Sequence, residues 1–114
     1  MRDSIALANG DGIYTHFSTV SGCTSKNNVG GGIRAARIDR SLEVANGGDG
    51  LVATGYVSNS MSADNTGAEL ACETLCPLSD NHFGGCSGTG CFGGAGPRFL
   101  MPADSNSCGG AICP

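Results

Sequence analysis

Six of the seven cysteines of this 114-residue chain lie between Cys72 and Cys113, in a segment rich in glycine, serine, asparagine and proline. Such a segment has too few large apolar side chains to form an ordinary hydrophobic core, and its glycines lose much conformational entropy on folding. Small chains of this kind depend on covalent cross-links or on a bound metal. The state of the cysteines therefore decides the predicted fold and compartment.

We predict disulfides rather than a metal, because the chain has no C-x2-C pair and zinc sites nearly always use short paired knuckles. Disulfides indicate an extracellular location or the surface of a cell or particle. An odd number of cysteines leaves one thiol that is either free or used in an intermolecular bond, and the pairing itself stays open. The candidate disulfide cysteines are Cys23, Cys72, Cys76, Cys86, Cys91, Cys108 and Cys113. Cys23 is the only cysteine of the first half, so it is the candidate to tether the two halves.

A metal or Fe–S site is the alternative, and it implies a reducing compartment. Four cysteines and one histidine fall within a short stretch that is able to surround one tetrahedral ion. These candidate ligands are Cys72, Cys76, Cys86, Cys91 and His82.

Residues 1–60 alternate apolar and polar side chains around two turn sequences, Asn9 to Gly12 and Asn46 to Gly50. Alternation around Asn-Gly and Asp-Gly is typical of β-hairpins, because these residues tolerate positive φ. We therefore expect two hairpins that pair into a small antiparallel sheet, with positive φ at Gly10 and Gly47. The similarity of the two turn regions indicates either an internal repeat or two alike hairpin turns.

Residues 61–114 are expected to form one short helix followed by a disulfide-stapled, glycine-rich lobe, within one compact domain overall. Thr66 and Glu69 have the spacing of a helix capping box, and Pro77 ends the apolar pattern. A helix over 66–76 would place Cys72 and Cys76 on one face. Residues 21–32 are predicted to be a loop.

Composition excludes several function classes. The net charge of −4 and the single lysine, Lys26, argue against nucleic acid as a partner, and no apolar run is long enough to span a membrane. No motif identifies a catalytic residue or a cofactor. We predict a non-enzymatic structural or surface subunit, such as a filament, sheath, coat or adhesive component. The alternatives are the metal-binding module and, third, a small secreted effector or inhibitor.

Self-association follows from the same pattern. The first predicted hairpin, residues 4–20, has only Asp11 as a formally charged side chain apart from His16. Charged residues, lysine above all, are the usual protection of an exposed sheet edge. We therefore expect the partners to be copies of this chain or neighbouring structural subunits.

Overall fold

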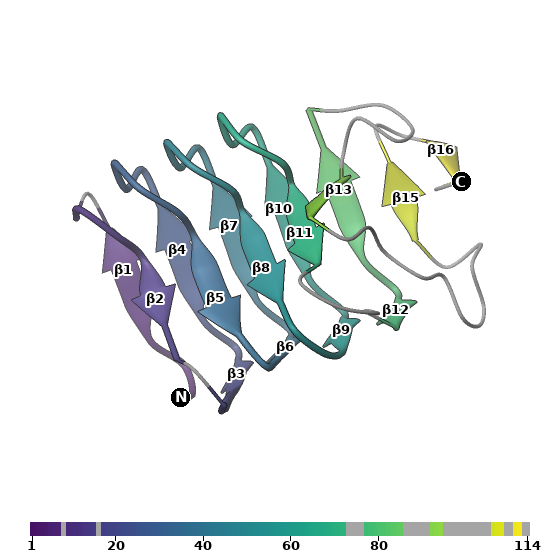
Figure 1. The fold of residues 1–114 in the computed structure, drawn as a ribbon, viewed down its shortest axis with the longest axis horizontal. Coiled ribbons are helices and arrows are strands. Elements are labelled where there is room, and N and C mark those ends of the chain that lie inside the picture. Colours follow the sequence, from purple (N-terminus) through teal and green to yellow (C-terminus); the bar gives the residue numbers. More distant parts are fainter. Residues whose placement is uncertain are drawn as a thin grey trace.

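The chain forms a β-solenoid, in which short strands of successive coils stack along one axis (Figure 1). The structure is a computed structural model that describes residues 1–7, 9–15, 17–72, 77–85, 92–94, 106–108 and 111–112. Each of the first four coils contributes one strand to each of three sheets, which we name A, B and C. Residues 5–7 and 111–112, the first and last strands along the chain, lie at opposite ends of the stack (Figure 1).

Sheet B has seven strands: β1 (Ile5–Leu7), β4 (Thr24–Lys26), β7 (Leu42–Val44), β10 (Met61–Ala63), β13 (His82–Gly84), β15 (Ser107–Cys108) and β16 (Ala111–Ile112). Sheet C has five: β2 (Ile13–Tyr14), β5 (Ile33–Ala35), β8 (Leu51–Ala53), β11 (Leu70–Cys72) and β14 (Phe92–Gly94). Sheet A has four: β3 (Thr19–Ser21), β6 (Arg37–Asp39), β9 (Val57–Ser58) and β12 (Leu78–Ser79).

Neighbouring strands are parallel and in register from coil to coil, apart from the antiparallel pair β15–β16. Sheet B shows the register most completely, because Ile5, Thr24, Leu42, Met61 and His82 occupy one row. In-register stacking places equivalent side chains of successive coils about 4.8 Å apart. Each position of a coil therefore forms a column along the solenoid.

Two aliphatic columns fill the interior. The column from sheet C and the column from sheet A are both fully buried or nearly so; their members are Ile13, Ile33, Leu51 and Leu70, then Val20, Ile38, Val57 and Leu78. Sheet B contributes smaller or polar inward side chains in the first four layers, followed by the buried side chains of Phe83 and Cys108. Each coil thus adds one medium-sized aliphatic residue to each of the two columns, so the core needs no tryptophan, and the chain has none.

The expected antiparallel sheet of two hairpins is wrong. Residues Asn9 to Gly12 and Asn46 to Gly50 do turn the chain, but each turn carries it from sheet B to sheet C. The strand before such a turn pairs with the equivalent strand of the next coil, as β1 does with β4. Neither Gly10 nor Gly47 has positive φ, because these corners are not two-residue hairpin loops. The segment 21–32, predicted as a loop, contains β4 and the corner that leads to β5.

The expected helix over 66–76 is also wrong. Residues 66–69 form a corner, and Leu70 to Cys72 form β11, which pairs with both β8 and β14. Pairing on two edges and burial of Leu70 outweigh a weak local helix preference. Residues 73–76 lie outside the described part of the chain. Within that part no helix occurs, and so none that is long and apolar enough to cross a membrane.

Candidate functional site: polar ladders and the end coil

An asparagine ladder, which we define as Asn9, Asn28, Asn46 and Asn65, runs along the corner between sheets B and C. The backbone N–H of each asparagine donates to the side-chain oxygen of the next: Asn9 to Asn28 at 2.9 Å, Asn28 to Asn46 at 3.1 Å, Asn46 to Asn65 at 2.8 Å. The side-chain amides of Asn28 and Asn46 donate to the same oxygens at 2.9 and 3.0 Å. Each coil is therefore bonded to the next by side chains as well as by strands.

The residue before each of Asn28, Asn46 and Asn65 bends the chain at the corner. Asn27, Ala45 and Asp64 all have φ between 56° and 58°, the left-handed region that asparagine and aspartate enter more readily than other non-glycine residues. Ala45 lacks a polar side chain to favour this conformation. It is therefore the strained member of the series.

Glu69 ends the asparagine ladder. Its carboxylate accepts from the backbone N–H of Asn65 at 3.2 Å and from the Asn65 side-chain amide at 2.6 Å, which are the two donors that a further asparagine would satisfy. Ser62 adds a hydroxyl at 2.9 Å. At the position of Glu69 the preceding coils have glycine, because a Cβ on Gly50 would overlap Ser62 Oγ of the next coil. The pattern read as a helix capping box is thus a cap on the ladder.

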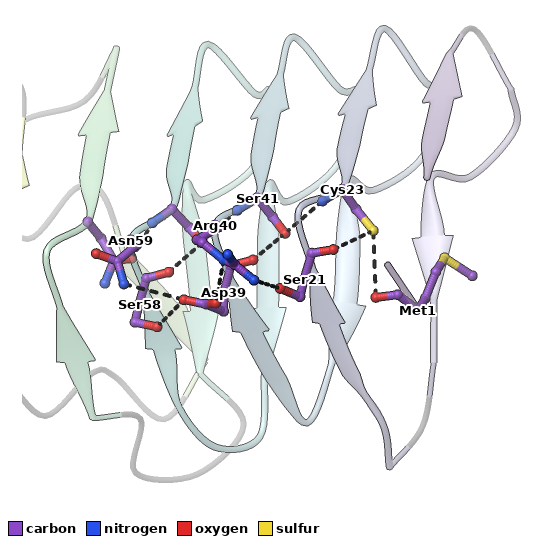
Figure 2. Close-up of polar contacts among 10 residues, drawn as sticks. Met1, Ser21, Cys23, Asp39, Arg40, Ser41, Ser58 and Asn59 are labelled. Atoms are coloured by element: carbon purple, nitrogen blue, oxygen red, sulfur yellow. Dashed lines mark hydrogen bonds and ion pairs between the residues drawn. The ribbon is translucent and has the colours of Figure 1, made fainter. Parts of the chain in front are cut away.

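A second ladder, the serine ladder, follows the corner between sheets A and B; its members are Ser4, Cys23, Ser41, Ser60, Asn81 and Asn106. The hydroxyls of Ser41 and Ser60 each donate to the carbonyl two residues earlier, at 2.9 and 2.8 Å. The Cys23 thiol donates to Ser21 in the same way at 3.4 Å (Figure 2). Cys23 therefore takes the place of a serine and is a free, buried thiol.

Polar side chains also cross the outer face of sheet A beside this ladder (Figure 2). Asp39 accepts from Ser58 Oγ at 2.7 Å and pairs with Arg40 at 3.0 Å. The hydrogen bond from Ser58 is the main reason that the pKa of Asp39 lies below its ordinary value, and Asn59 and Arg40 act in the same direction. Arg40 also donates to Ser21 Oγ at 3.0 Å, so the cluster links three coils.

Glu43 is the exception among the interior polar groups. Its side chain is fully buried, between Ser25 and Ser62 in the inward column of sheet B, and both carboxylate oxygens lack a hydrogen-bond partner among the described residues. Loss of hydration, with the nearby charge of Glu69 as a smaller cause, raises the pKa of Glu43 well above its ordinary value of 4.5. The folded protein therefore favours the neutral acid at this position.

The first coil forms the free end of all three sheets. Strands β1 and β2 are the terminal members of sheets B and C, and the chain start lies against β3, where Arg2 bridges to Ser21. Thr24 N–H donates to Ser4 C=O at 2.8 Å, so the alternate residues Ile5 and Leu7 direct their N–H and C=O groups away from β4. Asn9, the first member of its ladder, makes no side-chain hydrogen bond to any described residue.

A shallow cavity of about 350 Å³ lies on the outer face of sheet C, over β2, β5 and β8. Its lining includes Tyr14, Arg34, Asp11 and Asp49. The Arg34 guanidinium lies 5.4 Å from the centre of the Tyr14 ring, and Asp49 accepts from Ala68 N–H at 2.8 Å. Tyr14 and Arg34 thus contact each other, and Asp49 is bonded to the backbone of the next corner.

The predicted cysteine and histidine sites have separate positions. Cys72 and Cys108 are each disulfide-bonded, whereas Cys23 does not act as the predicted tether. No disulfide joins two cysteines of the described ranges, so the predicted disulfide-rich scaffold is not shown. Cys76, Cys86, Cys91 and Cys113 lie outside those ranges. His82 is exposed on β13, with Nδ1 hydrogen-bonded to Ser107 Oγ, and the described residues contain no cluster of three metal-ligating side chains.

Sequence reasoning missed both ladders. The signal was present in the asparagine spacing of 19, 18 and 19 residues and in the glycine-plus-aliphatic pair that follows Asn9, Asn28 and Asn46. The chain matches no known family model, no curated protein and no solved structure.

Proposed function

We propose that this chain is a non-enzymatic structural or surface subunit, a component of a filament, sheath, coat or adhesive layer, that assembles through its end coil. The observation that carries the proposal is the unpaired edge of β1, which has no charged side chain. An exposed strand edge is a template for another strand, and native proteins usually protect it with charge, a bulge or a covering segment. Here the two outward residues of β1 are Ile5 and Leu7, which are 68% and 53% exposed.

The interior supports a structural role as well. Most of the polar side chains in the ladders form hydrogen bonds between successive coils. Such repeated contacts make a solenoid a stiff unit to which further coils can be added. Two disulfide-bonded cysteines, Cys72 and Cys108, support a place outside the cell or on a particle surface. A disulfide-bonded Cys72 offers no thiolate, which argues against the metal-binding alternative.

Sedimentation velocity over a range of protein concentrations tests the proposal. We expect reversible association that weakens in Ile5→Lys, which places a charge on the edge strand. Met61→Lys is the matched control, because Met61 occupies the same row of sheet B in the central strand β10. Equal weakening by both variants would indicate packing through the outer face of sheet B. A monomer at every concentration contradicts the proposed function.

A further inference from the structure

The two ends of the solenoid differ. At the first coil all three sheets begin together, whereas at the other end the described strands finish at different levels, since sheet B continues through β15 and β16 after β12 and β14 end sheets A and C. Strand β16 also runs antiparallel to β15, so the regular parallel stacking stops there. Among the described residues, the opposite end therefore presents no set of parallel strand edges at one level that would complement the end that holds β1.

The asparagine ladder has the same polarity. Its donors point toward the later coils, where Glu69 accepts the last two, and no described residue donates to the side-chain oxygen of its first member, Asn9. A parallel coil joining at Asn9 would need to present free ladder donors. Within the described residues the asparagine ladder has none to present, because Glu69 accepts from both donors of Asn65. A head-to-tail row of copies is thus disfavoured for two reasons. The asparagine ladder has no described donors left for Asn9 of the next copy, and the described strands do not end at one level.

We propose, on the basis of the proposed function, that the end coil binds the end coil of a second copy about a two-fold axis, with β1 antiparallel to the partner's β1. Antiparallel pairing is what a two-fold axis across this edge produces, and the same patch then serves both copies. The axis passes through Ala6. Ile5 of each copy then faces Leu7 of the other.

This register pairs the free backbone groups at the edge of β1. Facing residues in a hydrogen-bonded antiparallel pair exchange both N–H···O=C bonds, and the outward N–H and C=O groups of β1 belong to Ile5 and Leu7. Their exposed side chains then pack as apolar cross-strand neighbours on the outer face of the joined sheet. Ala6, which points inward and is small, meets its own copy at the closest point of approach without a clash.

The size of the contact sets its strength. The solenoid measures 33 × 25 × 22 Å with its axis along the longest dimension, so each end face spans roughly the two shorter ones (Figure 1). Two such faces bury on the order of 1,000 Å² together, the lower limit for a specific interface. We therefore expect a reversible dimer rather than a permanent one.

A cysteine at the axis tests the register. In a non-hydrogen-bonded antiparallel pair the facing Cα atoms lie about 4.5 Å apart, within the range of a disulfide. Oxidised Ala6→Cys is expected to form a covalent dimer in which a peptide map finds residue 6 linked to residue 6. Leu7→Cys is the matched control, because each residue 7 faces residue 5 of the other copy.

A proline on the edge tests the hydrogen bonds. The Leu7 N–H points away from β4, so Leu7→Pro removes an edge donor without removing a bond within the coil. We expect the dissociation constant to rise at least about tenfold, with unchanged thermal unfolding of the dilute protein. Leu7→Ala, which keeps the N–H, is expected to have a smaller effect.

The outcomes separate this inference from the proposed function. A species that stops at the dimer and links through residue 6 supports both. Association that continues beyond the dimer, or a dimer that does not link through residue 6, overturns the two-fold arrangement and leaves the assembling subunit in place. A strict monomer for the wild type and for Ala6→Cys overturns both.

Discussion

Glu43 is a carboxyl group in the position that serine occupies in the coils on either side. Ser25 and Ser62 each donate to the backbone carbonyl of Gly32 or Glu69 in their own coil, at 3.1 and 2.8 Å. Only the protonated form of Glu43 is able to donate in the same way. The raised pKa of Glu43 is consistent with that replacement.

This predicts that stability depends on pH through Glu43. The folded state keeps a proton that the unfolded chain releases above about pH 4.5, so the free energy of unfolding falls as pH rises from that value toward the raised folded pKa. Below pH 4.5 this loss is absent. Urea unfolding at several pH values measures how steeply the free energy of unfolding changes with pH. We expect this decrease with rising pH to be smaller in Glu43→Gln than in the wild type. An unchanged slope in Glu43→Gln would show that Glu43 stays ionised in the fold.

Ala45 predicts a stabilising substitution. It is exposed and has φ of 57°, which costs an alanine about 1 kcal/mol, while asparagine tolerates the same conformation. We expect Ala45→Asn to raise the free energy of unfolding by about 0.5–1 kcal/mol. Ala36→Asn is the control, because Ala36 lacks positive φ and is expected to gain nothing. Equal effects at both positions would contradict the explanation by backbone strain.

At the scale of elements, the ladders do what short strands alone do poorly. Strands of two or three residues share few backbone bonds, and the asparagine and serine columns add bonds at two of the three corners. A buried amide that loses its acceptor carries a desolvation penalty. Replacing a residue in the middle of a ladder should therefore lower the stability much more than replacing the residue at its free end.

We predict this contrast for Asn46→Ala and Asn9→Ala. Loss of the Asn46 side chain removes the acceptor of two Asn28 donors, one from the backbone and one from the side chain, and is expected to cost on the order of 3 kcal/mol. Asn9 contributes no side-chain bond to the described residues, so its replacement is expected to cost less than about 0.5 kcal/mol. Chemical unfolding compares the two. Similar losses would mean that the ladder adds little beyond the strands.

Much of the β-structure was readable from the sequence, and its pairing was not. Alternation and Asn-Gly turns predicted hairpins at residues 9–12 and 46–50, where the structure has corners between sheets B and C, and nothing local distinguishes the two. The distinguishing information lies one coil away, in residues such as Asn28, whose glycine-rich surroundings resemble a loop. Glu69 was misread for the same reason, since its partner Asn65 is recognisable as a ladder end only after Asn46 and Asn28 are aligned with it.

At the scale of the whole molecule, each coil contacts only its neighbours, and the first coil has a neighbour on one side. Stability in such a stack is approximately a sum of coil and interface contributions, so opening should begin at an end. We expect hydrogen exchange of the dilute monomer to show lower protection at Lys26, whose N–H faces β1, than at Val44, whose N–H faces β4. Equal protection at both would indicate that the stack opens as a single unit.

Because the columns are regular, the number of coils can change without changing the surfaces at the two ends of the solenoid. Residues 42–60 form one complete coil, from the start of β7 to the serine-ladder member Ser60. Their removal would bring Asn28 against Asn65 and Ser41 against Asn81, the same kinds of contact that Asn46 and Ser60 make now. A gene encoding this chain is therefore able to gain or lose a coil by duplication or deletion of about 19 codons, changing the reach of the protein by about 4.8 Å while both terminal surfaces stay as they are.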